Sequence, residues 1–430
     1  MATFLKDLKN VGLSKIGIIL FGLGKSVILA RFLGPDANGT IASLAVFPSL
    51  FMTFGSLGIR QSTAYFLGKG IFNEEEIKRG IVQIWLLSCV FSLISSIVLI
   101  KYFSSSGEDN LLVFLAVLPI PFSLFNTYNS GIFLGKNQIT AFNRINWIPP
   151  FIGLISTFFL VVIFNFSIAG AMFSGFLGGF YMFVLLLAKK KFLDSFTWKV
   201  NWNVFKSLIS LGIVYAIALV LINLNYKIDV ILLDKISTPF QTGIYSKGAS
   251  IIEYLWQIPM LLSTIVFARS ASSKKSKEFS YKVVQLLRIS FVAIFLGSVL
   301  LGLTAPWLIY GLFGSEFELS ANVLVYLLPG VLLLTIFKVL NMDLAGRGKP
   351  WISLKAMLPA LIVNVILNLY MIPDFGAIGA SIASTISYSV AAVIYLIVYS
   401  KEVDIPIKEI VTYSKEDFSF IKKFKKLNED

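Results

Sequence analysis

Long apolar segments follow one another along almost the whole chain, and they constrain its fold more than any other feature. A helix needs about 20 apolar residues to cross a bilayer core of roughly 30 Å. Twelve segments meet this criterion: 11–33, 40–67, 80–103, 111–134, 146–166 and 167–188, then 208–234, 241–268, 283–312, 321–345, 352–372 and 376–399. The chain is 57% hydrophobic and 14% charged, which is too apolar for a soluble fold. We therefore expect an all-α, polytopic membrane protein of about 12 transmembrane helices.

Lysine and arginine are concentrated in every second connection between these segments. Of the 37 cations, 29 lie at the two ends of the chain and in 68–79, 135–145, 189–206, 269–288 and 346–355. The connections Gly34–Gly39 and Ser104–Asn110 contain none. Cations favour the cytoplasmic side of membrane proteins, so we expect both termini to be cytoplasmic. The net charge of +14 is thus a topology signal, and we expect no nucleic-acid partner.

The two halves of the chain resemble each other. Pro119 and Pro329 are 210 residues apart, and so are Pro149 and Pro359. The run Asn38–Ile41 resembles Thr242–Tyr245 at an offset of 204. A six-helix unit returns to the side on which it began, so we expect two parallel repeats with the substrate between them. The predicted domains are an N-terminal lobe at 1–188, a basic cytoplasmic linker at 189–207, a C-terminal lobe at 208–400 and a basic cytoplasmic tail at 401–430.

The chain lacks the residue types that most catalytic sites need. Cys89 is the one cysteine, it lies in an apolar segment, and there is no histidine. Disulfide frameworks, Cys/His metal sites and Cys-His nucleophiles therefore fail for want of residues. We expect no catalytic residue, no metal and no cofactor, and we do not expect an enzyme.

Charged side chains inside the apolar segments are the candidate functional residues. Near the bilayer centre each costs roughly 2.5 to 3.5 kcal/mol on insertion scales. The candidate cations are Lys25, Arg60, Lys227, Lys247, Lys338 and, at a segment end, Arg31. Cations with few acids to neutralise them indicate a hydrated, positive cavity that attracts an anion.

Some of these charged residues also have a structural alternative, and Lys247 or Glu253 can pair across the helix bundle. Arg31 sits at a segment end and can snorkel to the headgroups, and Lys227 can pair with Asp229. Lys25, Arg60 and Lys338 have no acid within helical reach of the same face, which makes them the stronger candidates. The acids Asp229, Glu253 and Asp343 are candidate proton or sodium sites for coupling to an ion gradient, and the sequence does not select among them.

Several segments resemble the Wzx-type polysaccharide and O-antigen flippases of the multidrug/oligosaccharidyl-lipid/polysaccharide (MOP) exporter superfamily. They are Ala30–Pro35, Phe54–Gln61, Asp229–Leu233 with Gly243–Ser246, Leu344–Pro350 and Asn368–Ala380. The matches follow one another in order over most of the chain, and the last segment is the most specific.

The resemblance implies a MATE-like fold and a flippase of the bacterial cytoplasmic (inner) membrane. Such a protein moves an undecaprenyl-pyrophosphate-linked oligosaccharide, the repeat unit of O-antigen, capsule or exopolysaccharide, from the inner to the outer leaflet by alternating access. A pyrophosphate is a multivalent anion that Lys and Arg bind by charge-assisted hydrogen bonds. Both the resemblance and their charge support Arg60 and Asp229 as functional residues.

Further partners and contacts follow from this function. We expect the sugar to meet polar and aromatic groups, with Asn126, Tyr128, Asn364 and Asn368 as candidates. The lipid bilayer is the other partner, and a polysaccharide polymerase and chain-length proteins are the protein partners that such a flippase would serve.

Two other functions compete. An ion-coupled multidrug or cation exporter of the same superfamily should need acids at its binding site, and the charge bias of the apolar segments speaks against it. A membrane-bound glycan polymerase or glycosyltransferase should carry a polar loop with paired carboxylates, and the connections here are too short and lack such a pair.

Overall fold

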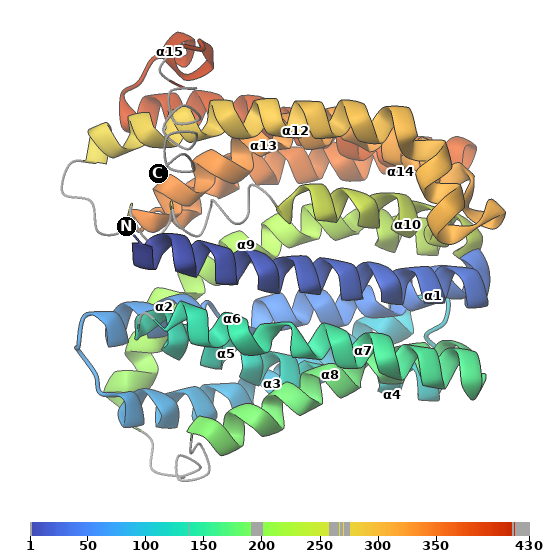
Figure 1. Ribbon diagram of the computed structural model, residues 1–430, viewed down its shortest axis with the longest axis horizontal. Helices are drawn as coiled ribbons and strands as arrows, with labels where there is room; N and C mark the ends of the chain where they lie inside the picture. Colours follow the sequence, from blue (N-terminus) through green and yellow to red (C-terminus); the bar gives the residue numbers. More distant parts are fainter. Residues whose placement is uncertain are drawn as a thin grey trace. The chain divides into compact units, whose positions relative to one another are not determined.

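Every regular element of the described residues is a helix (Figure 1). The computed structural model describes residues 2–136, 138–190, 201–257, 266, 270, 276–414 and 417. The first half contains α1 (Ala2–Gly55), α2 (Ile59–Gly68), α3 (Glu74–Phe103), α4 (Asn110–Val117), α5 (Ile120–Gly135), α6 (Ile139–Asn146), α7 (Ile148–Thr157), a π-helical turn (Phe158–Ile163) and α8 (Ser167–Lys190). The second half contains α9 (Trp202–Ile236), α10 (Pro239–Leu255), α12 (Ser276–Phe313), α13 (Leu319–Gly346), α14 (Leu354–Val403) and α15 (Ile407–Val411), with 3₁₀ turns at Ser315–Phe317 and Pro350–Ser353.

The helices accommodate the predicted membrane segments. Nine helical stretches within the described residues are long and apolar enough to cross a membrane. The two longest are Ile16–Gly68, which covers residues 16–33 of one predicted segment and all of 40–67, and Pro350–Val403, which contains both 352–372 and 376–399. The predicted segment 241–268 begins in α10, and its residues 258–265, 267 and 268 lie outside the described part. The all-helical, polytopic membrane fold is therefore confirmed.

Glycine provides the breaks that divide the two longest helical stretches. Gly34 has φ 71° and ψ 178° inside α1, and Gly376 has φ 51° and ψ −128° inside α14. Other residues reach these conformations only with strain, because a Cβ atom clashes with the backbone. Asn38 donates from Nδ2 to the carbonyl oxygens of Leu29 (2.8 Å) and Gly34 (2.7 Å), so acceptors next to the first break are satisfied. Satisfied backbone groups are what an apolar bilayer requires.

The chain divides into two compact units. Unit 1 comprises Met1–Gly243 with Leu312–Glu316, and unit 2 comprises Ile244–Gly311 with Phe317–Asp430. Helix α9 packs on α1, α2 and α3 and so belongs to unit 1. The predicted lobes, divided at 189–207, follow the sequence repeat and remain a prediction. Residues 191–200 of the predicted linker and 418–430 of the predicted tail lie outside the described part.

Unit 1 is held together by aromatic packing and by close helix contacts. Phe122, Phe125 and Phe183 meet with ring centroids 4.8 to 5.1 Å apart, and Trp85 donates from Nε1 to the carbonyl oxygen of Pro121 at 2.7 Å. A Cβ atom at Gly178 would lie 2.4 Å from the carbonyl oxygen of Pro149, so α7 and α8 approach backbone to backbone. Small residues allow such close approach in membrane helices.

Unit 2 is organised around the packing of α13 against α14. A Cβ atom at Gly330 would lie 2.6 Å from the Cα atom of Thr385. Tyr395 packs its ring on Phe337, with centroids 4.8 Å apart, and donates from its hydroxyl to Asn341 Oδ1 at 3.1 Å. Ser280 of α12 donates to the carboxylate of Asp343 on α13 at 2.6 Å and so links these two helices.

Substituting the second break tests its conformational role. Gly376→Ala should destabilise the protein by about 1–3 kcal/mol, because the backbone there is strained for any residue with a Cβ atom. The control is Gly311→Ala on α12, where an added Cβ atom meets nothing within 4 Å. Thermal unfolding in detergent should show a lower midpoint for Gly376→Ala alone. Equal shifts in both variants would contradict this role for Gly376.

Candidate functional site

Arg60 is a half-buried cation at the start of a helix. α2 begins at Ile59, after a break in which Leu57 and Gly58 adopt positive φ. The Arg60 backbone lies against α5, since a Cβ atom at Gly131 would be 2.7 Å from the Arg60 carbonyl oxygen. Its guanidinium makes no ion pair or side-chain hydrogen bond with any described residue.

The position of Arg60 adds to the positive character of this helix end. The first turn of a helix carries a partial positive charge from its backbone dipoles. Arg60 is the second residue of α2, so its full charge adds to that partial charge instead of neutralising it. An anion is stabilised by both, and helix N-termini are common anion-binding positions.

Lys25 is a second half-buried cation of unit 1 without a partner among the described residues. It projects from α1 toward α7 and α8. Its Nζ atom lies 3.5 Å from where a Cβ atom at Gly175 would be, and its Cδ atom lies 3.9 Å from the corresponding point at Gly153. Glycines at these two positions leave room for the lysine side chain between the helices.

Lys338 in unit 2 has partners. Its Nζ atom lies 3.9 Å from the centroid of the Trp256 ring, and the charge of Glu253 on α10 attracts it. Lys338 and Glu253 could be predicted from the sequence, whereas Trp256 could not. A Trp three residues after an acid, just past the end of α10, would have been the only signal, and it does not show which cation the ring meets.

The remaining charged candidates differ in burial. Asp229 and Lys247 are buried, Lys227 is half-buried, and all three take part in interactions. Arg31 is exposed and donates from Nε to the carbonyl oxygen of Leu312 at 2.9 Å. Their roles in binding or coupling remain predictions.

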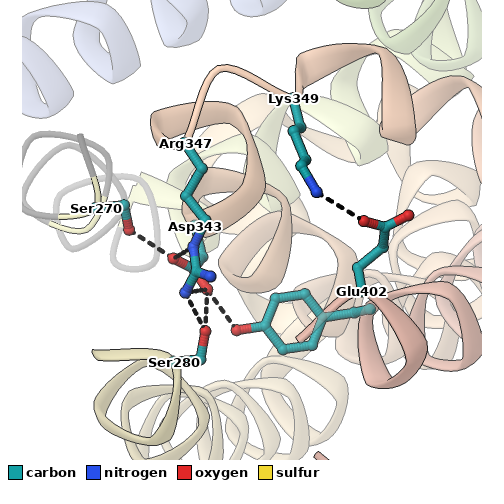
Figure 2. A network of polar contacts seen from close by, with 7 residues as sticks. Ser270, Ser280, Asp343, Arg347, Lys349 and Glu402 are labelled. Carbon is teal, nitrogen blue, oxygen red and sulfur yellow. Dashed lines mark hydrogen bonds and ion pairs between the residues drawn. The ribbon is translucent and has the colours of Figure 1, made fainter. Parts of the chain in front are cut away.

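Asp343 is the centre of a buried polar network in unit 2 (Figure 2). Arg347 Nε and Nη2 each donate to its carboxylate at 3.0 Å. The hydroxyls of Ser270 (2.7 Å), Ser280 (2.6 Å) and Tyr399 (2.7 Å) donate to the same two oxygens. Arg347 Nη2 also donates to the Ser280 hydroxyl.

This network gives Asp343 a structural role in the conformation observed. Five donor atoms fill the acceptor positions of the carboxylate, and they come from α12, from α14, from Ser270 and from Arg347, the residue that follows α13. A coupling ion would have to displace one of them. The nearby pair between Lys349 Nζ and Glu402 (3.1 Å) is more exposed, joins α14 to the turn that follows α13, and contributes less.

Neutralising Asp343 should therefore reduce stability. Asp343→Asn breaks the bidentate pair and leaves Arg347 without its counter-charge, at a cost of about 3–5 kcal/mol for a buried pair. Asp374→Asn, at an exposed acid with no partner in the described chain, is the control. Denaturant or thermal unfolding should separate the two variants. An Asp343→Asn protein of unchanged stability with altered gradient dependence would instead identify Asp343 as an ion site.

The four residues predicted to contact the sugar lie at contacts between packed helices. The Tyr128 hydroxyl donates to the Gly55 carbonyl oxygen and is also hydrogen-bonded to the Ser88 hydroxyl, and its side chain is fully buried. Asn126 Nδ2 donates to the Gly179 carbonyl oxygen at 3.0 Å. Asn368 Nδ2 donates to Asn364 Oδ1 at 2.7 Å, and both residues are fully buried. In this conformation Tyr128, Asn364 and Asn368 are not accessible to a sugar, because each is enclosed between helices.

Comparisons with known proteins place this chain in context. The model of the family described as "Polysaccharide biosynthesis protein" matches residues 28–322. An uncharacterized membrane protein of Methanocaldococcus jannaschii is 24% identical over 84% of this chain and 89% of its own length.

Two shorter matches carry functional names. The "Probable low-salt glycan biosynthesis flippase" of Haloferax volcanii is 30% identical over 19% of this chain and 18% of its own length. A capsular polysaccharide biosynthesis protein of Staphylococcus aureus is 26% identical over 46% of this chain and 50% of its own length. The chain thus spans less than two thirds of either of these two relatives.

Solved structures share the fold. The lipid II flippase MurJ, in an inward closed conformation, superposes with a TM-score of 0.71 at 15% identity, over 93% of this chain and 89% of MurJ. An inward-facing multidrug resistance MATE transporter of the MOP superfamily superposes with a TM-score of 0.73 at 15% identity, over 92% and 96% of the two chains. The predicted MATE-like fold is confirmed.

Proposed function

Because the chain belongs to the polysaccharide biosynthesis protein family, we propose that it is a flippase for a lipid-linked oligosaccharide. Its cargo is an undecaprenyl-pyrophosphate-linked repeat unit, carried from the inner to the outer leaflet of the cytoplasmic membrane. The flippase names of the Haloferax volcanii relative and of MurJ support this proposal. The protein acts as a transporter, and no step of its cycle requires bond chemistry by the chain.

The main support for the proposal is the environment of the Arg60 guanidinium. Arg60 is half-buried, lies at a positive helix end within an apolar stretch of the chain that is long enough to cross a membrane, and has no counter-charge among the described residues. Such a cation is costly in the membrane unless water or an anion meets it. A pyrophosphate offers several oxygens to the planar guanidinium, which binds it by paired hydrogen bonds.

Lys25 supplies a second cation of the same kind in unit 1. It is half-buried and has no described partner. Two uncompensated cations favour a multivalent anionic headgroup over a neutral or cationic substrate. Lys227, Lys247, Lys338 and Arg31 are the further cations proposed to contact the headgroup.

Alternating access of two six-helix lobes provides the movement, with both termini in the cytoplasm. The cation-rich connections support this orientation. An ion gradient drives the cycle, with Asp229 and Glu253 as the acids that carry a proton or sodium ion. A polymerase and chain-length proteins then use the flipped product.

A cation or drug exporter is the second candidate, because MATE transporters share this fold. Such a protein attracts cations with acids in its binding region. In unit 1 the half-buried charges without described partners, Lys25 and Arg60, are both positive. This observation favours the anionic substrate.

Removing the charge of Arg60 tests the proposal. Arg60→Gln should lower the rate of oligosaccharide flipping in proteoliposomes by about tenfold or more, since a charge-assisted hydrogen bond contributes about 1.5–3 kcal/mol. Arg60→Lys should restore part of the rate, because it keeps the charge and loses the paired geometry. Arg79→Gln, at an exposed arginine of α3, is the matched control. Equal rates in the Arg60→Gln and Arg79→Gln proteins would refute a role of Arg60 in binding.

The two remaining acids make a separate prediction. Asp229→Asn or Glu253→Gln should abolish the response of flipping to an imposed proton or sodium gradient, because an amide cannot carry the ion. Flipping is measured with and without the gradient in the same vesicles. A gradient response retained in both variants would remove both residues as coupling sites.

A further inference from the structure

The first turn of α10 and the first turn after the Gly34 break touch through their backbones. A Cβ atom at Gly39 would lie 1.9 Å from the carbonyl oxygen of Pro239. A Cβ atom at Gly243 would lie 2.0 Å from the carbonyl oxygen of Pro35. Both distances are far shorter than a real Cβ atom allows, so this approach requires glycine at both positions.

The contact is reciprocal, and its partners are equivalent in the sequence repeat. Pro35 and Pro239 are 204 residues apart, and so are Gly39 and Gly243. Each glycine meets the proline of the other repeat, as residues do across a two-fold axis. We call these four residues the outer crossing, because the cation-free connection Gly34–Gly39 is predicted to face the outer side.

A second link joins the two repeats on the same predicted side. Asp234, near the end of α9, is almost fully buried. Its carboxylate accepts from the backbone nitrogen of Ser105 at 3.0 Å and from the Ser105 hydroxyl at 2.7 Å. Ser105 lies in the predicted outer connection between α3 and α4.

We propose that the outer crossing is the closed outer gate of the translocation path and that the pair of Asp234 and Ser105 is its latch. This proposal rests on the proposed function, since only a path that opens alternately needs a gate. The oligosaccharide leaves on the outer side when the first turns of these two helices separate. Where a glycine packs on a carbonyl oxygen, no side chains interlock. The closed contact is therefore tight, and it can open without any repacking of side chains.

Substitutions that add a side-chain methyl group at the outer crossing test the gate, and we call them wedge variants. Gly39→Ala places a methyl group against a backbone carbonyl that the closed state holds in place, so the open state should gain population. The open-to-closed ratio should rise by about tenfold or more. Gly243→Ala should give a similar rise. The double variant should exceed either single variant only slightly, because one separation relieves both clashes.

The readout is the distance between spin labels at the predicted outer ends of α3 and α12. Cysteines replace Tyr102 and Tyr310, whose side chains are 75% and 63% exposed, and Cys89→Ala removes the one native thiol. Purified protein in nanodiscs should show a longer-distance population that grows in the wedge variants. Gly17→Ala is the matched control, because its Cβ atom would meet its nearest neighbour at an ordinary 3.6 Å.

The latch provides a second test that does not depend on the wedge variants folding. Asp234→Asn and Ser105→Ala should each raise the longer-distance population about threefold, the effect of one lost hydrogen bond. Unchanged distances in the folded wedge and latch variants, or a change no larger than in Gly17→Ala, would overturn the gate. A shift in distance in these variants, together with no flipping of lipid-linked oligosaccharide by the unsubstituted protein, would support the gate and contradict the proposed function.

Discussion

The hydrocarbon core of a bilayer offers neither hydrogen bonds nor counter-charges to the chain that crosses it. The backbone meets this constraint by forming helices almost everywhere in the described residues, and it breaks them at Gly34 and Gly376, where a positive φ is free of strain. Charged side chains must meet the same constraint individually. Each therefore either finds a partner in the protein or requires water or a ligand.

One acidic and one basic residue illustrate the two outcomes: Asp343 is fully buried and Arg60 is half-buried. Asp343 receives five donor atoms and ties together α12, α13 and α14, so its charge is fully compensated within unit 2. Arg60 lies at the positive end of α2 and has no such compensation among the described residues. The first arrangement stabilises a fold, and the second is typical of a binding site. This contrast is the physical basis for choosing an anionic lipid headgroup as the substrate.

The membrane segments could be predicted because length and apolarity alone identify a spanning helix. The partners of Asp343 could not, since Tyr399, Ser280 and Ser270 are 56, 63 and 73 residues away in sequence. The sugar contacts show the same difficulty. A polar residue in an apolar helix binds either a substrate or a neighbouring helix, and Tyr128 and Asn364 turned out to be packed between helices. Lys25 and Arg60 were selected because no acid lies within reach on their own helices, and the structure adds none from other described helices.

The most direct test uses the purified protein in liposomes with a fluorescent oligosaccharide on either a polyprenyl pyrophosphate or a neutral polyprenol carrier. Translocation is followed by an impermeant quencher added outside. We predict rapid movement of the pyrophosphate-linked lipid, little movement of the neutral one, and competition by excess unlabelled pyrophosphate-linked lipid. Equal movement of both lipids, or transport of an organic cation without movement of either, would contradict a flippase that recognises its cargo through uncompensated cations.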